Sequence, residues 1–173
     1  SSATSGLSGT SPWVTIWKQD PQLSNNIYVG RTDLFKSTNL AASWSSLASI
    51  TGTGTIREFA ISPNNSLVIY VLKSSGIFKT TNGGTSWTNV TGTVPIGSAL
   101  PEYICIKPSD ANTAWVVLSG YSNGNKVFMT TNGGTTWTNV SSNLPNIPTN
   151  CCVYEPGSSD RIYIGMDVGI YYK

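Results

Sequence analysis

The chain has 173 residues, a length that predicts one domain, or several small repeated units around a shared core. Charged residues make up only 10% of the sequence, against a typical ~25%, but the 39% hydrophobic and 10% aromatic fractions are those of a folded protein, which excludes a disordered chain. The net charge of +2 without a basic cluster excludes a nucleic-acid-binding surface, and no apolar run approaches the ~20 residues of a membrane span.

The N-terminal stretch "SSATSGLSGTSP" has neither the basic nor the apolar region of a signal peptide, which predicts a mature chain or an excised piece. Within it, "GLSGTSP" (6–12) is similar to "NVTGTVP" (89–95).

Four similar units follow in chain order, over residues 13–47, 57–90, 102–140 and 151–173. Each complete unit reads as two apolar runs around a polar turn, a third run, and a hairpin leading into a fourth run, which predicts four short strands. The last unit stops where its hairpin should begin. Equivalent residues Ser37, Thr80, Thr130 and Lys173 give periods of 43, 50 and 43 residues, typical of a propeller blade at ~40–50 residues, and helical periodicity is nowhere sustained.

The hairpin is nearly identical in the second and third units, "TTNGGTSWTNV" (80–90) and "TTNGGTTWTNV" (130–140). We expect the Asn82 side chain to accept hydrogen bonds from backbone N–H groups two or three residues on, Gly84 to take a positive φ, and the Thr80 hydroxyl to tie back the turn. Trp87 would cover the hairpin with an apolar face.

This pattern resembles the Asp-box, or BNR, signature of Ser or Thr, any residue, Asp or Asn, any residue, Gly, two residues, Trp. The matching residues are Thr80, Asn82, Gly84 and Trp87, then Thr130, Asn132, Gly134 and Trp137, and, with Ala41 in place of the glycine, Ser37, Asn39 and Trp44. The resemblance, to sortilin-like and xyloglucan-active (family 74-like) propellers, implies an all-β propeller with about four blades and a structural role for these residues.

The incomplete fourth unit raises the question of how a ring would close. One expectation is that residues 3–7 pair with residues 169–173 as the missing strand, closing a ring of four blades. The alternatives are that the chain is a piece of a larger ring, or that another chain completes it.

Cys105, Cys151 and Cys152, without any histidine, match no zinc pattern, so no metal or cofactor is expected. We interpret the cysteines as small apolar strand residues, with one disulfide from Cys105 to Cys151 or Cys152 as the alternative.

Asp33 and Asp167 follow the second strands of the first and last units. The resemblance implies catalytic aspartates in this region of xyloglucan-active hydrolases, with Arg31-Thr32-Asp33 similar to a sequence found there, and glycoside hydrolysis needs two carboxylates. The alternative interpretation is that both are turn formers. We favour the latter, and therefore a protein without catalytic activity.

Exposed aromatic rings near Asn and Ser side chains are a common means of holding neutral sugars. The aromatic residues not claimed by the hairpins are Trp13, Trp17, Tyr103, Trp115 and Tyr121, and we expect ligand contacts among them. The low charge and the richness in Gly, Thr and Asn resemble secreted bacterial proteins, which implies a secreted or cell-surface bacterial source, and we expect a binding module with a polysaccharide or glycan ligand. A xyloglucanase-like hydrolase domain and a scaffold for a protein partner are the alternatives.

Overall fold

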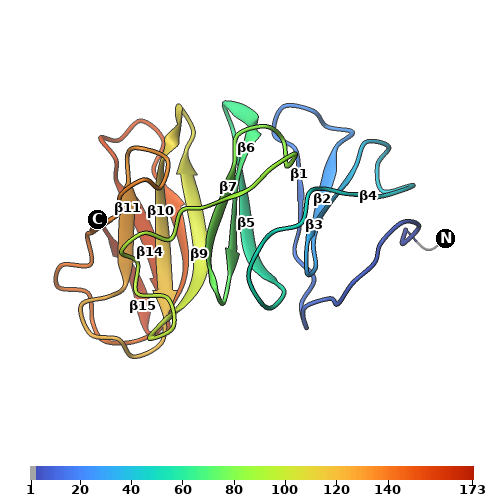
Figure 1. The fold of residues 1–173 in the computed structure, drawn as a ribbon. Helices are drawn as coiled ribbons and strands as arrows, with labels where there is room; N and C mark the ends of the chain where they lie inside the picture. Colours follow the sequence, from blue (N-terminus) through green and yellow to red (C-terminus); the bar gives the residue numbers. More distant parts are fainter. Residues whose placement is uncertain (1–2) are drawn as a thin grey trace.

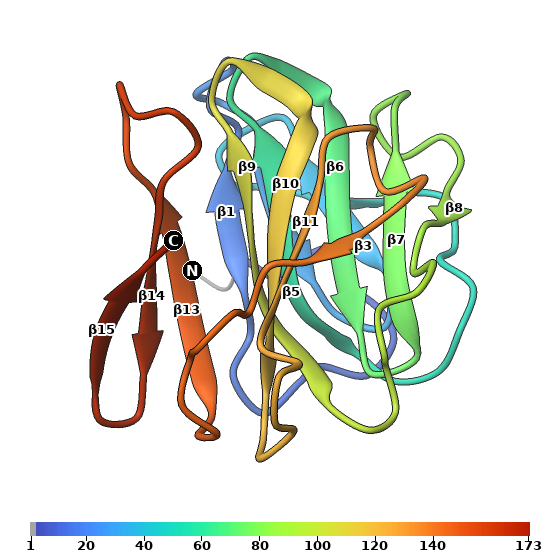
Figure 2. The same cartoon turned by 90° about the vertical axis from the view of Figure 1, so that its left-hand side faces the viewer.

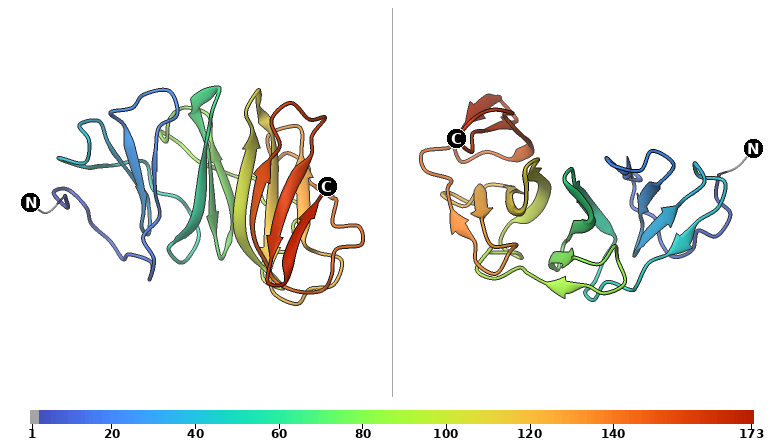
Figure 3. Two further views of the ribbon diagram at one scale, coloured as in Figure 1. Left: turned by 180° about the vertical axis from the view of Figure 1, so that it is seen from behind. Right: turned by 90° about the horizontal axis from the view of Figure 1, so that it is seen from above.

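The computed structural model describes residues 3–173, which form strands and turns without an α-helix. The strands make four antiparallel sheets that follow one another along the chain and stand side by side (Figure 1). Seen from above in Figure 3, the sheets form an open arc with the two chain ends at its opposite ends. This architecture is a partial β-propeller, which confirms the predicted fold class, and each sheet is one blade.

The strands of each blade begin and end within about two residues of the bounds of one repeat unit, except that β1 begins four residues after the start of the first unit at residue 13. The strands of each blade pair in chain order. The first blade contains β1 (Trp17–Gln19), β2 (Ile27–Gly30), β3 (Leu34–Ser37) and β4 (Ser45–Ser46). The second contains β5 (Ile56–Ser62), β6 (Asn65–Lys73), β7 (Gly76–Thr80) and β8 (Thr88–Asn89). The third contains β9 (Leu100–Lys107), β10 (Asp110–Ser119), β11 (Val127–Thr130) and β12 (Thr138–Asn139). The fourth contains β13 (Thr149–Tyr154), β14 (Ile162–Met166) and β15 (Gly169–Tyr172).

The core consists of three apolar layers, one between each pair of neighbouring blades. Because successive side chains on a strand point to opposite faces, one strand contributes to two layers. On β10, Val116 packs toward the second blade and Trp115 toward the fourth. The runs "VIYVL" and "AWVVL" are apolar without interruption because both of their faces are buried in this way.

The hairpins of the second and third blades have the expected glycine geometry, since Gly84 and Gly134 both have a φ of 89°. The Thr80 hydroxyl accepts the Gly84 N–H at 3.0 Å and donates to the Asn82 side chain at 2.8 Å. Asn82 Oδ1 accepts the N–H of Ser86 at 3.0 Å, four residues on and not two or three as expected. The turn is longer than predicted because the threonine hydroxyl already serves the nearer N–H groups.

The first hairpin keeps the same geometry without glycine. Ala41 has a φ of 67° and Leu40 a φ of 55°, and the Ser37 hydroxyl still accepts the Ala41 N–H at 2.9 Å. L-residues in this left-handed region are strained, so the surrounding hydrogen bonds hold the backbone where glycine would lie freely.

The expected closure by the N-terminus is not found. Residues 3–7 do not lie beside β15; they lie against the first blade, where Trp44 donates its backbone N–H to Ser5 O at 2.9 Å and its indole N–H to Ala3 O at 2.8 Å. In Figure 2, β15 is the outermost strand of a three-stranded sheet. Closing four blades into one ring would bring together two ends that the arc holds apart (Figure 3).

No helix among residues 3–173 has the length and apolarity that a membrane crossing requires.

Candidate functional site

The first strands of the second, third and fourth blades lie next to one another, and charged side chains connect the first strands of the first three blades. Lys18 Nζ on β1 lies 2.8 Å from Glu58 Oε1 on β5, and Arg57 on β5 lies 2.5 Å from Glu102 Oε2 on β9. These pairs join residues 40 and 45 positions apart, so sequence reasoning missed them. The only available signal was that equivalent strands of a propeller lie side by side.

We call the charged pairs between these first strands, Lys18–Glu58 and Arg57–Glu102, the site wall. Tyr103, a predicted ligand contact, lies beside this wall. Lys18 Nζ lies 5.2 Å from the centre of its ring, within the range of a cation–π interaction. Burial, with the Glu58 carboxylate as the second cause, raises the pKa of Tyr103. The ring is therefore half-buried behind an ammonium group and not presented as a free stacking surface.

A surface hollow of about 380 Å³ lies where the first strands of the first two blades begin. It is lined by Pro12, Trp13, Val14, Ile16, Thr55, Ile56 and Arg57. Trp13 is 100% exposed, and the Arg57 Nε–H donates to Pro101 O at 3.1 Å while its terminal nitrogen pairs with Glu102. The hollow thus combines an exposed indole ring with a guanidinium whose position is fixed by Pro101 O and Glu102. This combination suits stacking and hydrogen bonding of a polar ligand.

The other predicted aromatic contacts are distributed differently. Trp115 is 2% exposed, 5.7 Å from the Tyr154 ring between the third and fourth blades, and serves packing. Tyr121 is 73% exposed on the β10–β11 turn, and Trp17 is 65% exposed on β1. Neither Tyr121 nor Trp17 lines the hollow around Trp13.

The two candidate catalytic aspartates occupy equivalent turns, β2–β3 and β14–β15, on the first and last blades. Asp33 Oδ1 accepts the Ile50 N–H at 2.9 Å, and the buried Lys73 donates to Ile50 O at 3.2 Å. Burial lowers the pKa of Lys73, and the Asp33 carboxylate opposes this shift. Asp33 therefore has a structural role, holding the loop after the first blade and offsetting a buried ammonium.

Asp167 is exposed and accepts a hydrogen bond from Asn150 Nδ2 at 2.8 Å. Two blades separate it from Asp33, and neither residue lines the hollows described here.

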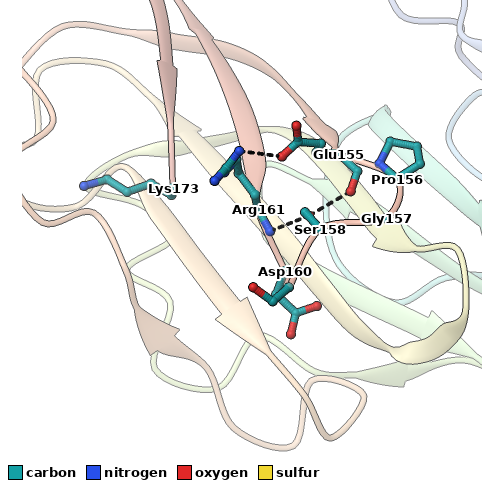
Figure 4. Close-up of a pocket in the computed structure, with 8 residues that line it drawn as sticks. Glu155, Pro156, Gly157, Ser158, Asp160, Arg161 and Lys173 are labelled. Carbon is teal, nitrogen blue, oxygen red and sulfur yellow. Dashed lines mark hydrogen bonds and ion pairs between the residues drawn. The ribbon is translucent and has the colours of Figure 1, made fainter.

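A second hollow, of about 520 Å³, lies in the β13–β14 loop of the fourth blade (Figure 4). Arg161 pairs with Glu155 at 3.0 Å, and its backbone N–H donates to the Ser158 hydroxyl at 2.9 Å, while Asp160 pairs with Lys107 at 2.5 Å. The polar groups of this loop bind one another or Lys107 of β9, and these contacts hold the turn. Residues 3–173 contain no group of three or more His, Cys, Asp or Glu side chains placed to hold a metal ion.

Comparisons with known proteins identify the fold. No protein-family model and no curated protein matches the chain. Among solved structures, an ancestral GH74 enzyme superposes with a TM-score of 0.73 at 23% identity, covering 95% of this chain and 23% of that one. The GH74 xyloglucanase from Xanthomonas campestris superposes with a TM-score of 0.68 at 12% identity, covering 87% of this chain and 26% of that one.

YCF48 bound to a D1 peptide gives a TM-score of 0.57 at 17% identity, covering 86% of this chain and 46% of that one. The chain therefore has the fold of these propellers and spans about a quarter of the length of the two GH74 enzymes.

Proposed function

We propose that this chain is a carbohydrate-binding propeller segment, in which a sugar ring stacks on Trp13 and hydrogen-bonds to Arg57. The observation that supports the proposal is the hollow between the first two blades, where the indole is fully exposed beside a guanidinium that is already positioned by Glu102 and Pro101. An aromatic ring with few rotatable bonds offers a large flat contact at a low entropic cost, which suits the apolar face of a sugar.

A neutral polysaccharide is the ligand class that fits best. The Arg57 charge is compensated by Glu102 at 2.5 Å, so the hollow offers donors without a free positive charge for an anion. The wider wall is also charge-paired, through Lys18 and Glu58. We further assign the three hairpins to the Asp-box type with a structural role, and the chain to a secreted or cell-surface bacterial protein, on its low charge and its richness in Ser, Thr and Asn.

Hydrolysis is the second candidate, supported by the fold shared with GH74 enzymes. The carboxylates argue against it, because each of the eight is held by an N–H, hydroxyl or cationic partner. The pairs, each with the carboxylate first, are Asp20–Gln22, Asp33–Ile50, Glu58–Lys18, Glu102–Arg57, Asp110–Thr113, Glu155–Arg161, Asp160–Lys107 and Asp167–Asn150.

The test incubates the purified chain with a panel of soluble and insoluble polysaccharides and records both depletion from solution and release of reducing ends. We expect depletion by a neutral polysaccharide, its loss in Trp13→Ala, and its retention in Tyr121→Ala, a matched removal of an exposed ring outside the hollow. Release of reducing ends that disappears in Asp33→Asn or Asp167→Asn would replace binding by hydrolysis. Depletion unaffected by Trp13→Ala would contradict the proposed site.

A further inference from the structure

Asparagine followed directly by glycine occurs three times in the chain, at Asn82-Gly83, Asn123-Gly124 and Asn132-Gly133. An asparagine in this setting can lose its side-chain amide, because the backbone nitrogen of the next residue attacks the side-chain carbonyl carbon and glycine has no side chain to obstruct the approach. All three asparagines are exposed to solvent, so exposure does not distinguish them. Their hydrogen bonds distinguish them.

In the hairpin of the second blade, the side chain of Asn82 is held at both of its terminal atoms. Its Oδ1 accepts hydrogen bonds from the Thr80 hydroxyl at 2.8 Å and from the Ser86 N–H at 3.0 Å, and its Nδ2 donates to the Ser86 hydroxyl at 2.9 Å. The attacking nitrogen is also engaged, since the Gly83 N–H donates to Leu67 O at 3.0 Å. Loss of the Asn82 amide therefore requires these bonds to open first.

The hairpin of the third blade holds Asn132 in the same way. Its Oδ1 accepts hydrogen bonds from the Thr130 hydroxyl at 3.0 Å and from the Thr136 N–H at 2.9 Å, and its Nδ2 donates to the Thr136 hydroxyl at 2.8 Å. The Gly133 N–H donates to Asn112 O at 2.9 Å. Both hairpins thus fix the asparagine amide and the nitrogen that would attack it.

The third asparagine–glycine pair lies in the loop that joins β10 to β11. This loop has seven residues, 120–126, whereas the corresponding turn between β6 and β7 has two. Its base is anchored, because the buried Lys126 donates from Nζ to Gly120 O at 2.5 Å and Asn139 Nδ2 donates to Gly124 O at 2.7 Å. These two contacts hold the loop to its blade on either side of the tip.

The tip of this loop leaves the reacting groups unengaged. The Asn125 N–H donates to Ser122 O at 3.1 Å, which closes a β-turn with Asn123 and Gly124 as its central residues. Within residues 3–173, no hydrogen bond involves the Asn123 side chain or the Gly124 N–H. Gly124 has a φ of 71° and open space where a side chain would lie. The attacking nitrogen and the amide are therefore both available in one exposed turn.

We propose that Asn123 is a site of spontaneous deamidation, and that the hydrogen bonds of the two hairpins protect Asn82 and Asn132 from the same reaction. The Gly124 nitrogen gives up its proton and forms a bond to Asn123 Cγ, the bond from Cγ to Nδ2 breaks, and the amide group leaves with that proton as ammonia. Water then opens the resulting succinimide ring at either carbonyl group, which gives aspartate or isoaspartate. Either product lowers the net charge of +2 by one unit.

Peptide mapping by chromatography and mass spectrometry, after incubation of the folded chain in warm, mildly alkaline buffer, tests this proposal. We expect Asn123 to convert to aspartate and isoaspartate, and Asn82 and Asn132 to convert at least about tenfold more slowly, because several hydrogen bonds must open first. The matched control is the same chain unfolded in guanidinium chloride, in which the three sites should react at similar rates. Equal rates at the three sites of the folded chain, or a faster reaction at either hairpin, would overturn the proposal.

Thr80→Val tests the protection within one hairpin. It removes the hydroxyl that donates to Asn82 Oδ1 and accepts the Gly84 N–H, so the deamidation rate of Asn82 should rise severalfold. Asn132 in the same variant is the control, because its rate rises as well only if the whole chain unfolds. Ser86→Ala, which removes the acceptor of the Asn82 amide at an exposed position, is the milder variant and should act in the same direction. An unchanged rate at Asn82 in both variants would contradict the protective role of the hairpin.

Discussion

The first and fourth blades both stand at an end of the arc, but their outward-facing apolar side chains differ in exposure. On the first blade, the outward-facing Val29 and Phe35 are 5% and 3% exposed, and the N-terminal segment is tied to this blade through Trp44 and Thr32. On the fourth blade, the outward-facing Ile170 and Tyr172 are 78% and 67% exposed. Both blades carry apolar residues on both faces, so the difference lies in what covers them.

This difference shows how a repeat protein distributes its stability. Each blade contributes half of two layers, so an end blade has one layer fewer than an internal blade and depends more on its single neighbour. The fourth blade is held to the molecule by the layer around Trp115 and Ile164. The first blade has the additional contacts of residues 3–10.

Substitutions on the two sides of the fourth blade should differ most in their effect on the free energy of unfolding. We expect Trp115→Ala, which empties the layer between the third and fourth blades, to lower the free energy of unfolding by about 3–5 kcal/mol. Tyr163→Ala, at the equivalent position on the outer face, should change it by less than about 1 kcal/mol in dilute solution, because that ring is already 36% exposed. Urea unfolding of both variants checks this, and equal losses would show that the outer face is not free in the monomer.

The propeller class and the blade count were predictable from the sequence because they depend on local signals repeated at a fixed period. The hairpins "TTNGGTSWTNV" and "TTNGGTTWTNV" fix their own turns through hydrogen bonds within five residues, as between Thr80 and Gly84. Their positions then determine where the strands fall. Even here the asparagine bonds lay one residue farther along than expected.

The placement of the N-terminal segment and the site wall could not be predicted, because both rest on contacts between distant residues. The similarity of residues 6–12 to 89–95 indicated a blade tail, but not the blade on which it lies. Lys18 and Glu58 meet only because β1 and β5 are neighbours in space. Asp33 and Asp167 occupy equivalent positions in the sequence, but the structure shows that the Asp33 carboxylate accepts a hydrogen bond from the Ile50 N–H, 17 residues away.

Oxidation distinguishes the two faces of the fourth blade at its cysteines. All three thiols are free, and Cys105 Sγ lies 3.3 Å from Cys152 Sγ across the layer between the third and fourth blades. Cys151 lies on the outer face of the fourth blade, which points away from the third blade. The disulfide that was the alternative interpretation of the sequence must therefore, if it forms, join Cys105 to Cys152 and not to Cys151.

With oxidised glutathione, the two thiols should form one disulfide while the glutathione disulfide is reduced to two thiols. The contact with Cys105 and burial raise the pKa of Cys152, so the reaction should be slow near neutral pH and faster in alkali. The bond should stabilise the protein by about 2–4 kcal/mol. Peptide mapping by mass spectrometry without reductant should find the link in wild type and Cys151→Ser and not in Cys105→Ser, and a link to Cys151 would contradict the observed facing of the strand.

The smallest expected effect concerns the hairpin of the first blade compared with that of the second. Ala41 has a φ of 67° where Gly84 has a φ of 89°, and a left-handed L-residue costs about 1–2 kcal/mol, against about 0.5–1 kcal/mol for the entropy of a glycine. We therefore expect Ala41→Gly to raise the free energy of unfolding by about 0.5–1 kcal/mol. The reciprocal variant Gly84→Ala should lower it, because the added methyl group would lie 2.5 Å from the Leu47 side chain. Thermal unfolding of both variants measures the pair, and a loss of stability in Ala41→Gly would contradict the backbone strain assigned to Ala41.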